Sequence, residues 1–178
     1  MGTLKFFYVV SLFGIGFLSA QEYESIPWSE KRLTWKDFRG AAPLSDRVAA
    51  TTASGISYQF STSGTRNSFK VDFEISTHFY PNESWYKPDL CDDVILSHEQ
   101  LHFDISELFA RKLRKGFSEA TFTHENVKQK IKALYKRNNR ELNDFQNQYD
   151  TETNFSRERE QQLIWNEKIK AFRKLMKN

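Results

Sequence analysis

Apolar and polar residues alternate along two stretches in the first half of the chain. The alternation runs through residues 56–60, ISYQF, and again through residues 69–75, FKVDFEI. A period of two predicts half-buried β-strands. Residues 61–67 lie between the two stretches and contain Gly64, so we expect them to form the connection of a β-hairpin.

Later in the chain the apolar residues recur at helical spacing instead. Three long stretches show this pattern and predict helices at residues 92–115, 123–149 and 156–176. Gly116 follows two basic residues and is the expected end of the first helix. Strands followed by helices indicate an α+β fold, with an N-terminal antiparallel hairpin or sheet followed by three long helices.

The first predicted helix contains the motif His98-Glu99-Gln100-Leu101-His102. Residues four apart lie on one face of a helix, so both imidazoles can bind a single Zn²⁺ ion. Glu99 directly follows the first histidine, where a carboxylate can act as general base on a zinc-bound water. The alternative is a pair of surface or core-edge histidines on a solvated helix. Because both histidines fall on or beside the apolar stripe, where unpaired polar groups are costly, the pattern favours a metal site.

The first twenty residues have a different character. A single lysine, Lys5, precedes the uncharged apolar run 6–17, and small residues end at Ala20. This order predicts a secretory signal peptide at residues 1–20, cleaved after Ala20, and a protein that is secreted or periplasmic. The alternative is a membrane anchor, but the run is shorter than the ~20 residues that span a bilayer. Residues 21–178 are then one domain, with no membrane span after signal removal.

Charge and cysteine content narrow the range of partners. The formal net charge is +3, and the basic surplus lies at 111–115, 128–140 and 168–177. These runs face away from the apolar stripes, so we expect solvated surface and no nucleic-acid partner. The single cysteine, Cys91, has no second cysteine with which to form an internal disulfide or a thiolate zinc cluster. The sequence leaves the oligomeric state open.

Several segments together resemble a bacterial family catalogued as domain of unknown function 922, whose members are described as secreted zinc-dependent proteases. The likeness covers nearly the whole chain after residue 20, and its most specific part is the motif helix, 93–108. The other matching segments, in order along the chain, are 33–40, 84–85, 110–111 and 149–153, followed by Gln161 and Trp165. The resemblance implies a zincin-like metallopeptidase fold.

One position departs from the family. Family members often have a histidine two positions after the equivalent of Thr153, a natural third zinc ligand, whereas this chain has Phe155. A catalytic zinc normally has three protein ligands. By helical position, Glu152 is the first candidate to replace that histidine and Glu141 the second. On the same count Asp144 and Asp150 point away from the site, and His78 and His124 are more typical of structural or exposed histidines.

Two functions remain. The first is a zinc metallopeptidase acting on a peptide or protein substrate, with His98 and His102 as ligands and Glu99 as base. Strand 69–79 would present an edge to an extended peptide, and Tyr149 or Tyr80 would stabilise the oxyanion. The second is a catalytically inactive binding or envelope protein on the same scaffold, which the substitution at Phe155 favours.

Overall fold

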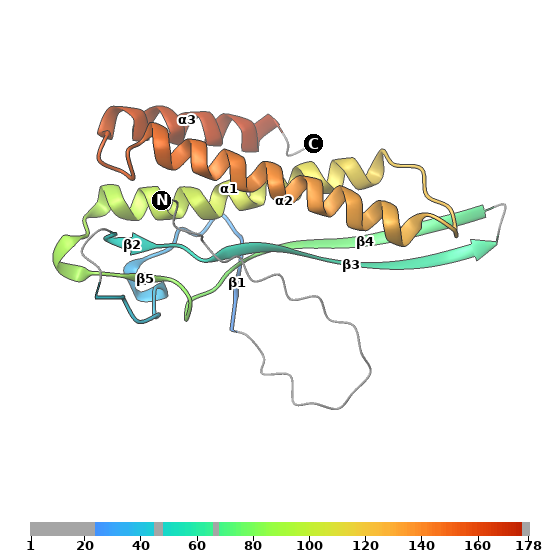
Figure 1. Ribbon diagram of the computed structural model, residues 1–178, viewed down its shortest axis with the longest axis horizontal. Helices are drawn as coiled ribbons and strands as arrows, with labels where there is room; N and C mark the ends of the chain where they lie inside the picture. Colours follow the sequence, from blue (N-terminus) through green and yellow to red (C-terminus); the bar gives the residue numbers. More distant parts are fainter. Residues whose placement is uncertain (1–23, 45–47, 66–67, 176–178) are drawn as a thin grey trace.

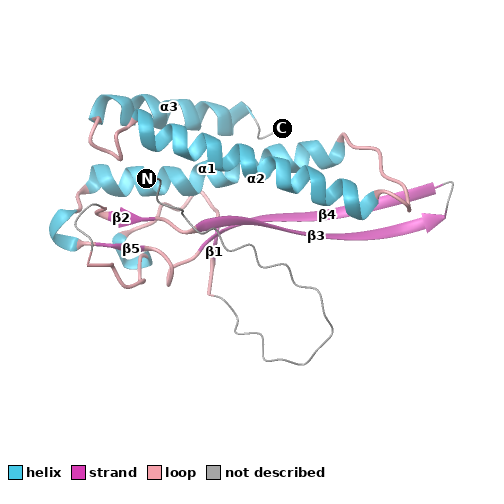
Figure 2. Cartoon of the chain, viewed as in Figure 1, coloured by secondary structure: helices cyan, strands magenta, loops and turns pink. Residues whose placement is uncertain are grey.

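The computed structural model describes residues 24–44, 48–65 and 68–175, and its architecture is α+β (Figures 1 and 2). Two small antiparallel sheets occupy the N-terminal half, and three helices follow. The expected signal peptide, residues 1–20, and the cleavage point after Ala20 lie outside the described residues. No helix among the described residues combines the length and the apolar character needed to cross a membrane.

A long hairpin forms most of the larger sheet. Strand β3 (Ser54–Thr65) pairs antiparallel with β4 (Ser68–Phe79) along its full length, from Ser54 opposite Phe79 to Thr65 opposite Ser68. Strand β1 (Ile26–Pro27) pairs with the end of β4, so the order is β1-β4-β3. The hairpin prediction is confirmed, but the strands extend well into the expected connection.

The smaller sheet stands beside the start of the first long helix. It pairs β2 (Ala50–Thr51) with β5 (Trp85–Tyr86). Two short 3₁₀ helices, η1 (Trp35–Asp37) and η2 (Pro88–Leu90), lie in the connecting segments.

Helix α1 (Asp93–Ser118) is the central element. It packs against β3 and β4 on one side and against α2 (Val127–Glu152) and α3 (Arg159–Leu175) on the other (Figure 1). Every residue from His98 to Ala110 is buried, because neighbours cover this part of the helix on several sides. The predicted end at Gly116 is wrong. The helix continues to Ser118, which places Phe117, 1% exposed, in the core beside Tyr58 and Phe73.

Two apolar clusters fill the interior. The larger joins the hairpin to all three helices; its fully buried members include Ile105, Ile131, Tyr149, Trp165 and Ile169. The smaller cluster contains Leu33, Phe38, Phe79 and Phe103 and attaches the N-terminal segment to α1.

Buried ion pairs beneath the N-terminal segment contradict part of the prediction that the basic runs are solvated surface. Asp104, 1% exposed, accepts hydrogen bonds from Trp28 Nε1 at 2.9 Å and from Arg32 at 2.6 Å. Arg173 of α3 bonds the same carboxylate at 3.1 Å. Arg111 is also partly buried, with its guanidinium 2.8 Å from Glu107. The solvated faces expected for the basic runs 111–115 and 168–177 are therefore wrong at Arg111 and Arg173, because buried carboxylates hold both guanidinium groups.

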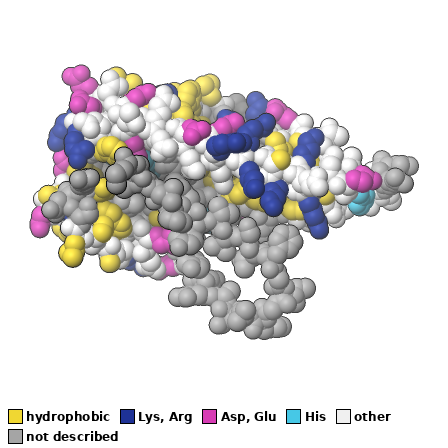
Figure 3. Space-filling model, viewed as in Figure 1, with side chains coloured by type: hydrophobic (Ala, Val, Ile, Leu, Met, Phe, Trp, Pro, Cys, Tyr) yellow, Lys and Arg dark blue, Asp and Glu magenta, His cyan; other side chains and the backbone are white. Residues whose placement is uncertain are grey.

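The first half of α2 does present the expected solvated basic surface. Lys and Arg side chains gather over this part of the molecule (Figure 3). The exposed ones among residues 128–140 are Lys128, Lys132, Lys136, Arg137 and Arg140.

Candidate metal centre

The motif helix α1 begins at Asp93, five residues before His98. Asp92 caps it, and its carboxylate accepts a hydrogen bond from the backbone N–H of Ile95 at 2.9 Å. This cap satisfies one of the free N–H groups at the helix start. From there His98, Glu99 and His102 fall at positions that the neighbouring helices cover, and all three are buried.

The two histidines and one aspartate from α2 form a compact cluster. His98 Nε2 lies 3.2 Å from His102 Nε2. Asp150 Oδ1 lies 3.2 Å from His98 Nε2 and 2.9 Å from His102 Nε2. All three side chains are at least nine-tenths buried, and together they can hold a metal ion.

The donor chemistry of this cluster suits a divalent cation. A carbonyl oxygen faces the Nδ1 atom of each imidazole, that of Gln162 at His98 and that of Gln146 at His102. A carbonyl oxygen only accepts hydrogen bonds, so each Nδ1 carries a hydrogen and each neutral ring has its lone pair on Nε2. Two lone pairs and a carboxylate oxygen thus converge in a buried space. Such a set can hold a cation at its centre, which would offset the repulsion between electron-rich groups buried together.

Glu99 adds a second carboxylate to the same buried region. It is 5% exposed, and its Oε2 has no hydrogen-bond partner among the described residues. Its backbone carbonyl accepts a hydrogen bond from Thr52 Oγ1 at 3.0 Å, which ties this turn of α1 to the strand segment after β2. A buried carboxylate oxygen without a partner is costly, and functional sites are where such groups are found.

The structure corrects the expected third ligand. Glu152 is exposed, and its carboxylate accepts hydrogen bonds from Gln148 at 2.7 Å and Trp165 Nε1 at 2.8 Å. The bond from Gln148 is the main reason that the pKa of Glu152 is lowered, and the bond from Trp165 adds to it. Asp150, which was expected to point away, is the carboxylate that joins the histidines.

Glu141, the second candidate, also lies elsewhere. Helices α1 and α2 pack antiparallel (Figure 1). Their register, however, places Glu141 beside Lys112, 2.7 Å from its Nζ, and not beside His98 and His102. The hydrogen bond from Lys112 lowers the pKa of Glu141.

The remaining sequence candidates lie outside the cluster or have other partners. His78 is half-buried within β4 and hydrogen-bonds Ser25 and Ser57, while His124 is exposed and packs on Phe69. Tyr80 packs near Gly55 and His78. These contacts leave all three without a part in the metal cluster.

Tyr149 lies at the cluster but is held by its neighbours. Its ring stacks on His98 with centroids 4.5 Å apart, and its hydroxyl lies 2.9 Å from Gln162 Oε1 and 3.2 Å from the backbone oxygen of His98. Burial, followed by the nearby Glu99 and Asp150, raises the pKa of Tyr149 well above its usual value. The phenol is therefore a neutral donor to these groups, and the expected oxyanion role would need it to leave them.

A tight turn follows the cluster. Three consecutive residues, Asn154, Phe155 and Ser156, have left-handed backbone conformations, with φ of 47°, 54° and 71°. Such a run is rare for residues other than glycine and is found where surrounding structure enforces it. The backbone N–H of Phe155 bonds the carbonyl of Asp150 at 2.9 Å, and the Phe155 ring is exposed. The turn folds α3 back onto the helices, so that Gln162 reaches His98.

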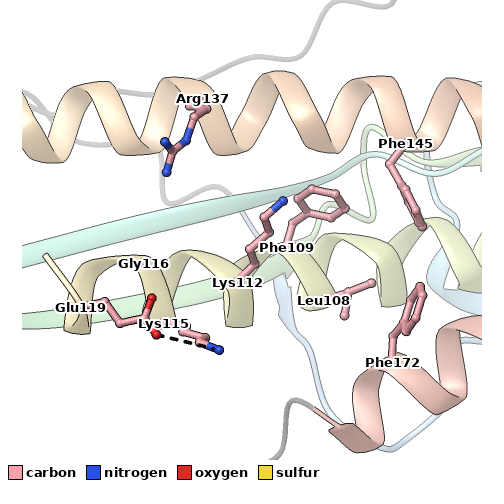
Figure 4. Close-up of a pocket in the computed structure, with 9 residues that line it drawn as sticks. All are labelled: Leu108, Phe109, Lys112, Lys115, Gly116, Glu119, Arg137, Phe145 and Phe172. Carbon is pink, nitrogen blue, oxygen red and sulfur yellow. Dashed lines mark ion pairs between the residues drawn. The ribbon is translucent and has the colours of Figure 1, made fainter.

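A separate hollow lies toward the other end of α1. It has a volume of about 560 Å³ and is lined from all three helices (Figure 4). Its apolar residues are Leu108, Phe109, Phe145 and Phe172, and its charged residues are Lys112, Lys115, Glu119 and Arg137. None of the cluster residues lines it.

The spacing of apolar residues could not identify Asp150, Gln146 or Gln162 as part of the site, because all three are polar. Gln146, Asp150 and Thr153 are buried at helical spacing along α2, yet all are polar. A stripe drawn through Phe145 and Tyr149 continues to the exposed Glu152, whereas the polar side of the buried face runs through Gln146 and Asp150. The available signal was the pairing of a carboxylate with an amide one turn earlier, at the same spacing as His98 and His102.

Comparison with known proteins gives one match. No curated protein and no solved structure matches the chain. Residues 34–157 match the model of a family described as "Bacterial protein of unknown function (DUF922)". The matched region contains His98, Glu99, His102 and Asp150. Because it spans more than half of the chain, the protein belongs to this bacterial family.

Proposed function

We propose that this protein is a zinc-dependent hydrolase that cleaves peptide bonds. The observation that carries the proposal is the buried convergence of His98 Nε2, His102 Nε2 and Asp150 Oδ1, with the buried Glu99 directly after His98 in the same helix. At zinc bond lengths of about 2.0–2.1 Å and tetrahedral angles, ligand atoms lie about 3.3–3.4 Å apart. The separations here are 2.9, 3.2 and 3.2 Å, so a small adjustment admits the ion.

The residues then have distinct roles. His98, His102 and Asp150 would hold the ion, and a catalytic zinc with three protein ligands would also bind a water or the substrate. A zinc ion bound there supplies a Lewis acid and makes a water molecule acidic enough to attack at neutral pH. Glu99 would take the proton of the attacking water at Oε2, the oxygen that has no partner among the described residues, and pass it to the leaving amine.

A strand edge near Glu99 supports a peptide as the substrate. The expected edge on residues 69–79 is wrong at the end near the site, since β1 pairs with β4 at His78 and Phe79 while β3 occupies the other side. The segment from β2 into β3 lies closer. Thr52 bonds Glu99, and Ser54 Oγ lies 2.8 Å from Ser106 Oγ of α1. Among the described residues β3 has a neighbouring strand, β4, on one side only, so an extended peptide could pair with its other edge. We also propose that the protein is exported, with residues 1–20 acting as its signal peptide.

The variant Glu99→Gln tests the chemistry. The amide keeps the size and hydrogen-bonding capacity of the side chain but does not accept the proton. We expect the variant to bind zinc as the unaltered protein does and to lose hydrolysis by about 10²-fold or more. Zinc content is measured by elemental analysis, and cleavage by mass spectrometry on a diverse peptide library.

The exposed carboxylate Glu83, two residues before β5, offers a matched control. Glu83→Gln removes an exposed carboxylate that is not part of the cluster and should cleave at the rate of the unaltered protein. Equal rates for Glu99→Gln and the unaltered protein would show that Glu99 is not the base and would reject this mechanism.

A second candidate is a binding protein that holds the metal without turnover. Two observations favour it: the cluster residues are buried, and the ligand-sized hollow is lined by other residues. Stoichiometric zinc in a protein that cleaves nothing in the library would support this alternative over the hydrolase.

A further inference from the structure

Each histidine of the cluster is held from behind by a glutamine of a different helix. Gln162 of α3 places its Oε1 2.9 Å from His98 Nδ1, and Gln146 of α2 places its Oε1 against His102 Nδ1. Both glutamines are buried, 2% and 7% exposed. They contact the ring nitrogen opposite the one that faces Asp150.

The surroundings of Gln162 determine which way its amide points. Its Oε1 accepts from His98 Nδ1 and from the Tyr149 hydroxyl, which uses both lone pairs of the oxygen. Its Nε2 donates to Asn166 Oδ1 at 2.9 Å, and Asn166 in turn donates to Ser97 Oγ at 3.1 Å. A reversed amide would turn its oxygen toward Asn166 Oδ1, which is also an acceptor, and would lose that bond.

Gln146 is oriented in the same sense by a hydroxyl chain that leads to the sheet. Its Nε2 lies 3.4 Å from Ser106 Oγ, which is paired with Ser54 Oγ of β3. Ser106 Oγ donates its hydrogen to the His102 backbone oxygen at 3.2 Å, so it accepts from Gln146 Nε2, and the Gln146 carbonyl oxygen is the atom that faces His102. The two amides repeat one arrangement, although they come from separate helices.

We propose that Gln146 and Gln162 are positioning residues of the metal centre. They hold both imidazoles in the Nδ1–H form and aim both Nε2 lone pairs at a single cation beside Asp150. This inference rests on the proposed function. Outer partners of ligating histidines act in this way, fixing the ring orientation and the tautomer, and their loss weakens metal binding about 10- to 100-fold.

The inference gives α3 a role in the site. The residues matched by the family model end at 157, before α3 begins at Arg159. The three ligand residues and Glu99 lie inside the match, whereas Gln162 and Asn166 lie beyond it. The C-terminal helix thus completes a centre whose ligands come from α1 and α2.

Substitution at the two glutamines, read out as zinc affinity, tests the inference. We expect Gln146→Leu and Gln162→Leu each to weaken zinc binding about 10- to 100-fold in competition with a chelator. Gln162→Glu keeps an oxygen acceptor toward Nδ1 and should bind within a few-fold of the unaltered protein. A residue needed only for packing would not be rescued by a carboxylate.

Asn138→Leu is the matched control. Asn138 is a buried amide on α2, 4% exposed, and twelve residues, or about 18 Å of helix, separate it from Asp150. This variant should keep full zinc affinity. An equal loss in Asn138→Leu, or unchanged affinity in both Gln→Leu variants, would overturn the inference.

A measurement on the unaltered protein avoids any effect of substitution on folding. Long-range ¹H–¹⁵N spectra of the zinc-loaded protein should show His98 and His102 with hydrogen on Nδ1 and zinc on Nε2. Hydrogen on Nε2 in either ring would overturn the inference while leaving zinc binding intact. A protein that binds no zinc would overturn both this inference and the proposed function.

Discussion

Asp150 and Glu152 lie two residues apart on α2, but the first is buried and the second is exposed. Asp150 is 6% exposed and meets both histidines, whereas Glu152 is exposed and bonds Gln148 and Trp165. Two residues advance a helix by about 200°, which is enough to move a side chain from the buried face to the surface. The identity of the third ligand therefore depends on a rotation of about half a helical turn.

The pair allows a matched prediction. Asp150→Asn removes the anionic ligand and should weaken zinc binding by more than about 100-fold, beyond the loss typical of outer partners. Glu152→Gln should leave zinc binding unchanged. Isothermal titration or chelator competition measures both, and the reverse ranking would restore Glu152 as the ligand.

At the scale of elements, α1 extends past a glycine that was expected to end it. Gly116 lies within the helix, and a Cβ added there would have no atom within 4 Å. Continued packing of Phe117 against Tyr58 and Phe73 offsets the weak helix propensity of glycine. Tertiary contacts thus override a local stop signal.

Gly116→Ala should consequently stabilise the protein. The substitution adds a side chain in open space and reduces the conformational freedom of the unfolded chain, for a gain of about 0.5–1 kcal/mol. Chemical denaturation measures the free energy of unfolding. Gly64→Ala is the control and should destabilise the protein, because Gly64 has φ of 100° and a Cβ there would lie 1.8 Å from the Ser68 carbonyl oxygen. A destabilised Gly116→Ala variant would contradict the account of this helix end.

At the scale of the whole molecule, Glu107 joins the sheet to α1. Its carboxylate accepts hydrogen bonds from Thr77 of β4 at 2.7 Å and from Arg111 at 2.8 Å and Arg114 at 3.1 Å. Arg114 also bonds the backbone oxygen of Ile75. Burial alone would raise the pKa of Glu107, but these hydrogen bonds outweigh it and hold the pKa below its ordinary value.

This lowered pKa predicts an acid-sensitive contribution to stability. A carboxyl group whose pKa is lower in the folded state stabilises the fold above its unfolded pKa of 4.5, and the contribution is lost as the pH falls through the folded value. At pH 7, Glu107→Gln should cost about 3 kcal/mol, since it removes a buried charge and leaves the partly buried Arg111 and the more exposed Arg114 without their counter-charge. The cost should shrink at pH 3.

Denaturation of the metal-free protein at both pH values measures this difference. Other titrating groups are common to the two proteins and cancel. Glu119→Gln provides a surface comparison, because Glu119 lies 3.8 Å from Lys115 and is 65% exposed, so its loss should cost less than about 1 kcal/mol at either pH. A cost for Glu107→Gln that does not change with pH would reject the role of its ionised form.

The pattern of apolar and polar residues predicted most of the fold, because strands and helices are recognised from the spacing of residues that are close in sequence. Alternation over 56–60 and 69–75 identified the hairpin, helical spacing identified all three helices, and the motif identified a pair of histidines one turn apart. The errors lie at ends and on polar faces. The strands run further than the alternation, α1 passes Gly116, and the polar residues buried along α2 did not contribute to an apolar stripe.

By itself the sequence determined the α+β order of elements, the family and the spacing of His98, Glu99 and His102, since each is a property of neighbouring residues or of the linear pattern. Only the tertiary structure decided the rest of the site. Asp150 and Gln146 reach the histidines through the antiparallel register of α1 and α2, and Gln162 reaches them through the turn that folds α3 back. Register and helix phase are determined by packing between distant segments, and no local spacing records them.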